Sequence, residues 1–413
     1  MKGVFWHSEY ECFYSMKVLI VINDLGSGGA QKSLVSFLTC LSEKNQLKDY
    51  EIDLLVSNKS GIFLERVPKD VNLLNTDAKL VWMNCPLNNR SLRKSATFSS
   101  IILKIKWIVI YRYNKKNGNY YAGKTLWESW KKYIAYNDKE YDVAISYMDG
   151  WPNYYVMEKV QARKKVLWIH NEYQKLGYDS TYDLNFYMQC DEIITISKKC
   201  KLSFIETFPQ LTKKIHVLEN ISLASNIIRR SEEFSPEEFY NDGKQRIVSV
   251  GRLCEQKGFD IAIEAAKSLK QRGVSFIWYI LGDGPEKNKL MSLIKTYGLD
   301  NDVLLLGIKS NPYPYISQAD IFVQTSKFEG KSIVLDEAKI LLKPIIVTNY
   351  DTVYDSIINE ETGIVVAMDG EAVANGIYRL LNDYNLRQKL IQNLQKVGCG
   401  NEEELKKYID IML

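Results

Sequence analysis

Short apolar runs rich in β-branched residues recur along the chain, each followed by a turn and a segment with helical spacing. Runs such as KVLIVI and IFVQ are apolar throughout, which is typical of parallel strands covered by helices on both faces. This alternation is the signature of βαβ units and predicts an α/β fold built from doubly wound parallel sheets. We expect strands at residues 18–23, 52–57, 141–146, 165–169, 192–196, 215–218, 246–250, 275–281, 303–306, 320–324, 344–348 and 363–366.

The length of the chain and one polar segment predict two Rossmann-like domains. A chain of 413 residues is too long for one ordinary core. Residues 222–244 are charged and poor in strand-forming residues, and they separate two complete series of strands and helices. We therefore expect domains at 16–222 and 223–388, with helices in 389–413 that cross back to the first domain. Two facing sheets would leave a cleft at the carboxyl ends of their strands, where open α/β sheets bind ligands.

Segment lengths and residue spacing exclude several classes of protein. No apolar run approaches the roughly 18 residues of a membrane-spanning helix. Residues 1–15 lack the apolar centre of a secretory signal, so we expect a cytoplasmic protein. The seven cysteines are scattered and contain no C-x-x-C pair, so neither a disulfide framework nor a zinc site is indicated. The sole D-x-D motif, Asp300 and Asp302, precedes an expected strand instead of following one, and we expect no metal site.

The two halves of the chain differ in charge. Residues 1–222 hold 31 Lys and Arg against 23 Asp and Glu, which suggests an anionic partner surface. The excess is greatest in residues 101–133, where basic residues alternate with Trp and Tyr and Glu128 is the only acid. Such a stretch suits peripheral contact with an anionic membrane, and no recognition motif for nucleic acid accompanies it. The basic residues are Lys104, Lys106, Arg112, Lys115, Lys116, Lys124, Lys131 and Lys132.

A glycine-rich turn joins the first expected strand to the first expected helix. Gly28 and Gly29, in the sequence NDLGSGGAQ, would let backbone N–H groups and the helix N-terminus approach an anion closely. The dinucleotide fingerprint G-x-G-x-x-G/A is an alternative, but Gln31 stands where its third glycine would be. A tight turn without a ligand is the other alternative.

In the second half of the chain, two expected strands are each followed by residues that could bind a diphosphate. Arg252 and Lys257 lie in VGRLCEQKGFD, just after the strand at 246–250. Arginine can bind a phosphate through two parallel hydrogen bonds, and lysine binds it as a point charge. Gly282 and Gly284 follow the next strand in LGDGPE, where phosphate binding and a turn before a proline-started helix are equally good explanations.

The sequence FEGKSIVLDEA places two carboxylates eight residues apart. We expect Glu329 in a loop over the cleft and Glu337 about one and a half turns into a helix that Ser332 caps. The first turn of that helix offers free N–H groups to a phosphate, and both carboxylates can accept hydrogen bonds from sugar hydroxyls. A hydrolase pair is the alternative, but it needs its two carboxyl groups on opposite sides of the glycosidic bond.

In order and spacing, GSGGA, GRL-x-x-x-KG, LGDGPE and E-x7-E resemble the retaining family 4 (group 1) glycosyltransferases with the GT-B fold, and the resemblance covers residues 16–411. It implies that Arg252 and Lys257 bind the diphosphate of a nucleotide-sugar donor. It also implies that Glu329 contacts the donor sugar and that Glu337 holds the nucleotide ribose. Catalysis in this family is metal-independent, so we expect no metal and no cofactor besides the nucleotide sugar, which is a substrate.

The resemblance assigns three further positions. The backbone amides of Ser332 and Ile333 would complete the phosphate site. His170, at the end of KVLWIH, stands where family members often have a histidine near the transferring anomeric carbon, and a packed cleft-edge histidine is the alternative. Lys331 and Ser332 replace the aromatic residue and the glycine of many members, which bears on the identity of the sugar. The catalytic candidates are therefore Glu329, His170, Arg252 and Lys257, and the donor-binding candidates are Gly28, Gly29, Arg252, Lys257, Gly282, Gly284, Ser332, Ile333 and Glu337.

The sequence thus predicts a retaining glycosyltransferase of cell-surface polysaccharide or capsule biosynthesis. It would move a sugar from a nucleotide diphosphate sugar, expected to be a UDP-sugar, to a glycan or lipid-linked glycan acceptor on the first domain. We expect it in the cytoplasm, peripherally associated with the inner face of the cell membrane. A catalytically idle GT-B subunit that stabilises a partner transferase is the alternative, and an NAD(P)H-dependent oxidoreductase is a more distant one.

Overall fold

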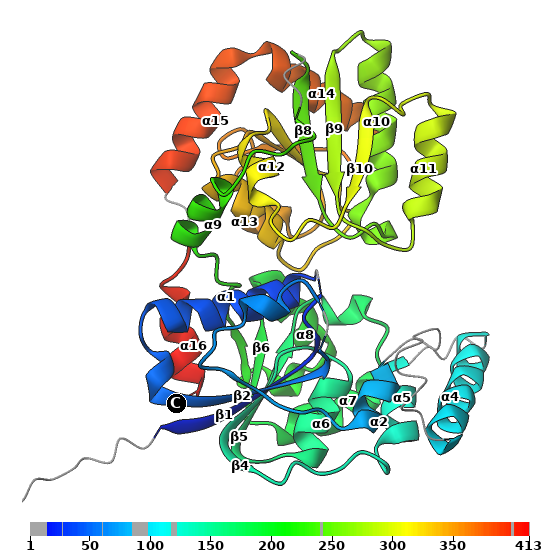
Figure 1. Ribbon diagram of the computed structural model, residues 1–413, viewed down its shortest axis with the longest axis vertical. Coiled ribbons are helices and arrows are strands. Elements are labelled where there is room, and N and C mark those ends of the chain that lie inside the picture. The colour runs from blue at the N-terminus through cyan, green and yellow to red at the C-terminus, as the bar shows by residue number, and fades with distance from the viewer. Residues whose placement is uncertain are drawn as a thin grey trace, which may run out of the picture.

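The computed structural model describes residues 15–26, 28–59, 61–84, 98–116, 122–239, 243–397 and 400–412. These residues form two units, each built around one sheet, and the units are stacked along the long axis of the molecule (Figure 1). All pairs of named strands in both sheets are parallel. The predicted α/β architecture of two doubly wound parallel sheets is therefore confirmed.

The first sheet has seven strands in the order β3-β2-β1-β4-β5-β6-β7. Its order reverses between β1 and β4, and ligands of open α/β sheets bind at such a switch point. The strands are β1 (Met16–Asp24), β2 (Tyr50–Asn58), β3 (Asn72–Leu73), β4 (Glu140–Ser146), β5 (Gln161–Ile169), β6 (Glu192–Thr195) and β7 (Ile215–Val217). The helices are α1 (Gly29–Glu43), α2 (Ala78–Asn84), α4 (Phe98–Lys116), α5 (Ala122–Trp130), α6 (Trp151–Lys159), α7 (Ser180–Gln189) and α8 (Lys198–Thr207).

The second sheet has six strands in the order β10-β9-β8-β11-β12-β13, and its switch point lies between β8 and β11. The strands are β8 (Gln245–Val250), β9 (Phe276–Leu281), β10 (Val303–Gly307), β11 (Ile321–Gln324), β12 (Ile345–Thr348) and β13 (Ile364–Val366). The helices are α9 (Ala224–Ser231), α10 (Phe259–Gln271), α11 (Lys287–Thr296), α12 (Tyr313–Ser317), α13 (Ile333–Ile340), α14 (Gly370–Asn382), α15 (Tyr384–Val397) and α16 (Glu404–Met412).

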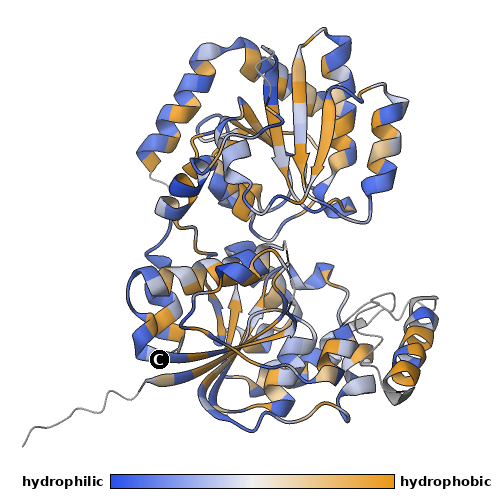
Figure 2. Cartoon of the chain, in the orientation of Figure 1, coloured by the Kyte–Doolittle hydropathy of each residue, from blue (hydrophilic) through white to orange (hydrophobic). Residues whose placement is uncertain are grey.

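The strand β1 shows why the apolar runs are continuous. Val18, Ile20 and Ile22 pack into the core on one face of the first sheet, and Leu19 and Val21 pack into the core on the other. All five side chains have no solvent exposure. Because helices cover both faces, neither face tolerates polar residues, and the strands appear as apolar bands between the helices in Figure 2.

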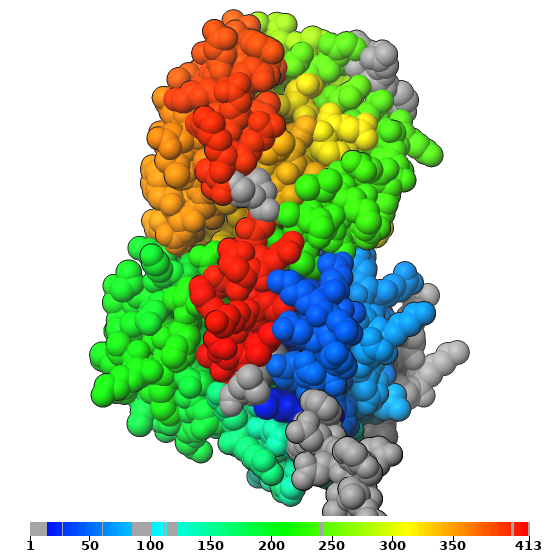
Figure 3. Space-filling model, turned by 90° about the vertical axis from the view of Figure 1, so that its left-hand side faces the viewer, coloured from blue at the N-terminus to red at the C-terminus, as the bar shows by residue number. Residues whose placement is uncertain are grey.

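The chain crosses between the two units twice. The polar segment at 222–244 contains α9, which packs against α12 and α13 of the second unit. At the other end of the chain α16 returns to the first unit and lies beside α1, where the rings of Tyr408 and Phe37 are 4.8 Å apart (Figure 3). The domain boundaries at 222/223 and 388/389 stay predictions from the sequence.

The basic and aromatic stretch at 101–133 divides into a part that lies in the core and a part that lies at the surface. Trp127 and Trp130 of α5 are fully buried and belong to the core of the first unit. The Lys104 ammonium is also buried, and it donates hydrogen bonds to backbone carbonyl groups of α2. Among the described residues of this stretch, α4 presents apolar and basic residues outward at the periphery of the molecule (Figure 1), and Lys132 and Tyr133, just after α5, are exposed as well. No described helix is long and apolar enough to cross a membrane.

Candidate active site

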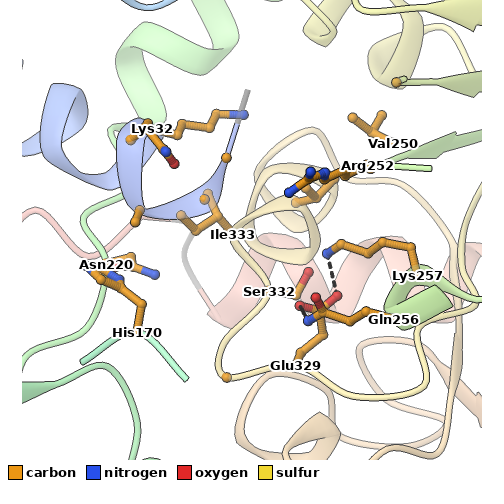
Figure 4. Close-up of a pocket in the computed structure, with 18 of the residues that line it drawn as sticks. Lys32, His170, Asn220, Val250, Arg252, Gln256, Lys257, Glu329, Ser332 and Ile333 are labelled. Carbon is orange, nitrogen blue, oxygen red and sulfur yellow. Dashed lines mark hydrogen bonds and ion pairs between the residues drawn. The ribbon is translucent and has the colours of Figure 1, made fainter. Parts of the chain in front are cut away.

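A cavity of about 390 Å³ lies between the two units, at the carboxyl ends of both sheets (Figure 4). Both switch points open into it, since its wall contains residues that follow β1, β4, β8 and β11. Most of the predicted site residues line this cavity, whereas Gly284 and Glu337 do not. The predicted residues in its wall are Gly28, Gly29, His170, Arg252, Lys257, Gly282, Glu329, Ser332 and Ile333.

The glycines of the wall allow close approach of backbone segments. Gly29 begins α1 and faces the second unit, because a Cβ built on it would lie 3.7 Å from Cδ1 of Ile333. Gly282 has a φ of +147°, and a Cβ there would lie 1.8 Å from the carbonyl oxygen of Gly251. A Cβ on Gly284 would lie 2.4 Å from the carbonyl oxygen of Leu253, outside the cavity wall. The structure thus gives Gly284 a packing role between neighbouring turns.

Arg252 and Lys257 have different surroundings. The Arg252 side chain is exposed and makes no hydrogen bond or ion pair within the described residues, so its guanidinium is free to bind an anion in the cavity. The Lys257 ammonium points to Glu329 and forms an ion pair with its Oε1 (Figure 4). Sequence reasoning placed both cations on a phosphate but did not foresee that Lys257 pairs with Glu329.

Glu329 is buried and held by several donors. Its Oε1 accepts a hydrogen bond of 2.6 Å from the Ser326 hydroxyl in addition to the ion pair with Lys257. The Gln324 amide lies 3.5 Å from the same oxygen, and its own carbonyl oxygen accepts a hydrogen bond from Ser332. These contacts fix the carboxylate at the edge of the cavity. Gln324 was not predicted, although a glutamine that ends a buried apolar strand is the signal that could have found it.

Ser332 is the residue at which α13 begins, as predicted, but its hydroxyl does not cap the helix. The hydroxyl donates instead to Oε1 of Gln324 at 2.7 Å. The first N–H groups of an α-helix have no carbonyl partner within the helix. At the start of α13, the Ser332 side chain accepts no hydrogen bond from them. The amides of this turn therefore offer hydrogen-bond donors and a partial positive charge beside the cavity.

His170 lies across the cavity from this turn, at the end of β5. Its Nε2 is 3.0 Å from the carbonyl oxygen of Tyr147, which can only accept, so Nε2 carries the proton and donates. Burial lowers the pKa of His170 to about 4, although the hydrogen bond to Tyr147 opposes this. The ring is therefore neutral near pH 7 and leaves Nδ1 as an acceptor. A Cβ on Gly330 would lie 2.5 Å from the His170 carbonyl oxygen, so a glycine lets the two units approach here.

Asp149 is a cavity residue that sequence reasoning missed. It follows β4, is buried, and its Oδ2 has no hydrogen-bond partner within the described residues. Burial raises the pKa of Asp149 to about 6, and the negative charge of Asp183 adds to the effect. Its place near the switch point of the first sheet is a signal that could have found it.

We expect Asp149→Asn to change how stability depends on pH. A raised pKa means that the folded protein holds this proton more tightly than the unfolded chain does, so the stabilising contribution is present below pH 4 and is lost as pH rises through about 6. The free energy of unfolding of the variant, relative to wild type, should therefore increase by about 2.5 kcal/mol between pH 4 and pH 7.5. Urea unfolding at both pH values measures this difference. The lowered pKa of His170 contributes equally to the pH dependence of both proteins, so its effect cancels in the comparison. A difference in unfolding free energy that does not change with pH would contradict the expectation.

No group of three or more His, Cys, Asp or Glu side chains in the described part of the chain is arranged to hold a metal ion. Asp302 of the D-x-D motif lies just before β10, forms an ion pair of 2.7 Å with Lys270 and is not among the residues that line the cavity.

Comparisons with known proteins agree with this arrangement. Residues 230–397 match the family described as glycosyl transferases group 1. The N-acetylgalactosamine-N,N'-diacetylbacillosaminyl-diphospho-undecaprenol 4-alpha-N-acetylgalactosaminyltransferase of Campylobacter jejuni is 26% identical over 395 residues, which cover 94% of this chain and 96% of the relative.

Solved structures share the two-unit fold. A glycosyltransferase from Rickettsia africae superposes with a TM-score of 0.66 at 16% identity, covering 97% of this chain and 98% of the other. The Anabaena protein HepE in complex with UDP-glucose superposes with a TM-score of 0.67 at 14% identity, covering 96% of this chain and 98% of the other. Residues 230–397 therefore belong to the glycosyl transferases group 1, and the chain as a whole has the GT-B fold of these solved structures.

Proposed function

We propose that this protein transfers a sugar, with retention of anomeric configuration, from a nucleoside diphosphate sugar to a glycan or lipid-linked glycan acceptor in cell-surface polysaccharide biosynthesis. The single observation that carries the proposal is the cavity between the units, in which a free arginine, a carboxylate held by Lys257 and a helix N-terminus face His170. A UDP-sugar is the donor we favour, because the HepE structure contains UDP-glucose. The lipid-linked acceptor is supported by the name of the Campylobacter relative.

The diphosphate would lie between Arg252 and the first turn of α13. Negative charge grows on the leaving diphosphate as the glycosidic bond breaks, and preorganised donors stabilise that charge most in the transition state. Arg252 has no competing partner in the described residues, and the amides that follow Ser332 have no side-chain cap. The chain therefore offers a phosphate site that needs little rearrangement.

The donor sugar would lie beside Glu329, and the acceptor would approach from the first unit. Glu329 is oriented by Ser326 and Lys257, so it can accept hydrogen bonds from sugar hydroxyls at a fixed place. His170 faces the sugar position from the opposite side as a neutral ring. A neutral imidazole adds no positive charge next to an oxocarbenium-like carbon, which favours its place near the reacting centre.

We expect nucleoside diphosphate sugars to stabilise the protein and to be turned over without added metal. The first measurement is the shift of thermal unfolding with a panel of UDP-, GDP-, ADP- and dTDP-sugars, because a ligand that binds only the folded state raises its stability. Hydrolysis of the stabilising donor is then assayed with and without EDTA. Turnover that survives EDTA is the expected result. Loss of turnover with rescue by Mn²⁺ or Mg²⁺ would contradict metal-independent catalysis, and binding without turnover with any acceptor would favour the idle-subunit alternative.

We further propose that α4 holds the protein peripherally at the inner face of the cell membrane. Four apolar or aromatic side chains at helical spacing form one stripe along α4, and they are exposed by 49 to 68%. The ribbon of this helix carries broad hydrophobic bands in Figure 2. Lys106 and Arg112 are exposed on the two flanks of the stripe. An apolar stripe between basic flanks is the pattern of helices that lie in the membrane interface. The stripe consists of Ile102, Ile105, Val109 and Tyr113.

Reversing the flanking charges should release the protein from anionic vesicles. Each basic residue near an anionic leaflet contributes about 1 kcal/mol, so the double variant Lys106→Glu and Arg112→Glu should reduce binding by more than about tenfold. Vesicle sedimentation at two salt concentrations measures the effect, and donor hydrolysis should stay unchanged. A matched control is Arg163→Glu with Lys198→Glu, which makes the same charge change at exposed positions away from α4. Equal loss in the control, or equal binding to neutral vesicles, would contradict the proposal.

A further inference from the structure

Lys32 reaches from the first unit into the second. It lies in the second turn of α1, and its ammonium forms an ion pair with Oε1 of Glu337 on α13. The side chain of Lys32 is 14% exposed and that of Glu337 is 1% exposed, so water screens this pair little. Figure 4 shows the Lys32 side chain extending from α1 into the space between the units. A buried contact between the two units therefore ends on the carboxylate assigned to the donor ribose.

The two oxygens of Glu337 differ in their contacts. Oε1 receives both the Lys32 ammonium and the Tyr313 hydroxyl, which donates a hydrogen bond of 3.2 Å. Oε2 is buried and has no partner within the described residues. A buried carboxylate oxygen without a partner costs free energy, and a ligand that donates a hydrogen bond to it recovers that cost. One oxygen of Glu337 is thus held by the protein, and the other is left for a donor.

Cations surround this carboxylate from both units. The Lys32 ammonium is 5.0 Å from the centre of the Tyr313 ring, and the Arg230 guanidinium is 5.3 Å from it. Burial lowers the pKa of Lys32, the charge of Glu337 opposes that shift, and Arg66 and Arg230 lower the pKa further. Glu337 therefore favours the charged form of the Lys32 ammonium, against burial and the two arginines. The ion pair with Lys32 in turn holds the Glu337 carboxylate in one place.

Glu337 lines a second cavity of about 300 Å³, which adjoins the first and shares Lys32, Phe63 and Ile333 with it. Residues of both units form its wall, including Arg66 from the first and Tyr313 from the second. A nucleotide whose diphosphate lies at the start of α13 would bring its ribose toward this carboxylate, because Glu337 lies one turn further along the same helix. A ribose has two neighbouring hydroxyl groups, and the unpartnered Oε2 of Glu337 can accept hydrogen bonds from them.

We propose that Lys32 is a positioning residue of the donor site, which holds Oε1 of Glu337 so that Oε2 accepts hydrogen bonds from the ribose hydroxyls. This inference rests on the proposed function, in which the donor is a nucleoside diphosphate sugar. It adds that ribose recognition is completed by a side chain of the first unit, although Glu337 itself and the diphosphate site at Arg252 and α13 belong to the second. An open arrangement of the units, without Lys32 on Glu337, would recognise the diphosphate but not the ribose.

The test compares ribose recognition in wild type and in variants of Lys32. Calorimetry first finds which of UDP, GDP and ADP binds wild type most tightly, and the matching 2'-deoxy and 2',3'-dideoxy nucleotides follow. Wild type should bind the ribonucleotide about tenfold more tightly than the dideoxy form. In Lys32→Met this ratio should fall below about threefold, because the freed carboxylate loses its fixed orientation, whereas Lys32→Arg should keep it.

Two further variants separate positioning from a general loss of contact between the units. Lys175→Met removes another ion pair between them, of 3.2 Å to Asp351, without touching Glu337, and it should leave the ratio unchanged. Tyr313→Phe removes the other donor to Oε1 and should lower the ratio partly, which keeps the test usable if Lys32→Met does not fold.

The possible outcomes distinguish the inference from the proposed function. If wild type binds none of the three nucleotides and is stabilised by no sugar of the thermal-shift panel, the proposed function fails and the inference fails with it. If only a dTDP-sugar binds, the proposed function stands and the inference is overturned, because that donor has no ribose 2'-hydroxyl. If wild type binds a nucleotide but Lys32→Met keeps the full ratio, only the inference is overturned. Tighter binding of the ribonucleotide to Lys32→Met than to wild type would also overturn it, because Lys32 would then compete with the ribose for Glu337.

Discussion

Arg252→Ala should lower the turnover number of the glycosyltransferase by about 10² to 10³, the usual loss when one preorganised donor to a developing charge is removed. The Arg252 guanidinium has no partner within the described residues and lines the cavity, so the variant removes a ligand contact and no structural one. The free energy of unfolding should stay within about 0.5 kcal/mol of wild type, as for most surface substitutions. Steady-state kinetics and urea unfolding together measure both effects.

The control for this variant is Arg272→Ala, which removes an arginine of the same unit that pairs with Glu371 outside the cavity. It should leave turnover unchanged. Lys257→Ala should also reduce turnover, but it leaves the buried Glu329 carboxylate without its ion pair and should therefore destabilise the fold as well. Turnover near the wild-type value in both Arg252→Ala and Lys257→Ala would contradict the phosphate site.

Glu329→Gln should mainly lower kcat, by a factor on the order of 10², whereas Glu337→Gln should mainly raise the KM for the donor. Glu329 is held at the cavity edge by Ser326 and Lys257, next to the position of the reacting sugar, so its charge acts where the bond breaks. Glu337 lines the second cavity, and a contact to the donor ribose there would contribute equally to the ground state and the transition state.

Measurement of kcat and KM with the same donor separates the two roles. Glutamine keeps the size of each side chain, so the comparison changes charge with little change of packing. An increase of KM alone in Glu329→Gln together with a decrease of kcat alone in Glu337→Gln would mean that the two carboxylates have the opposite roles.

The sheets could be predicted because their signal is local. Each of the twelve expected strands is present with its ends shifted by at most four residues, since both faces of the sheets are covered and the apolar runs are continuous. The short strand β3 was missed because two residues form no apolar run. In the stretch at 101–133, composition does not show which side of a helix faces the core. In α5 that side carries Trp127 and Trp130.

The candidate site could be predicted only where a motif contains its residues. Arg252, Lys257 and Glu329 follow buried strands, and strand ends of parallel sheets gather at one edge, so the sequence indicates their place. The contact of Lys32 with Glu337 joins residues more than 300 positions apart and depends on how the units face each other. No local pattern marks such a residue. Asp149 was missed for the same reason, since its significance comes from burial beside the cavity.

The measurement that tests the central claim most directly is proton NMR of the reaction with the donor that the thermal-shift panel selects. The account predicts that the sugar leaves an α-linked nucleotide donor and first appears in the product as the α-anomer, with release of the nucleoside diphosphate and without added metal. The new glycosidic linkage does not mutarotate, so its anomeric signal reports the configuration directly. When water is the acceptor, the free sugar mutarotates, and an early time course of the anomeric signals identifies the anomer that forms first. Appearance of the β-anomer first, or no turnover of any nucleotide sugar with any glycan acceptor, would contradict the account.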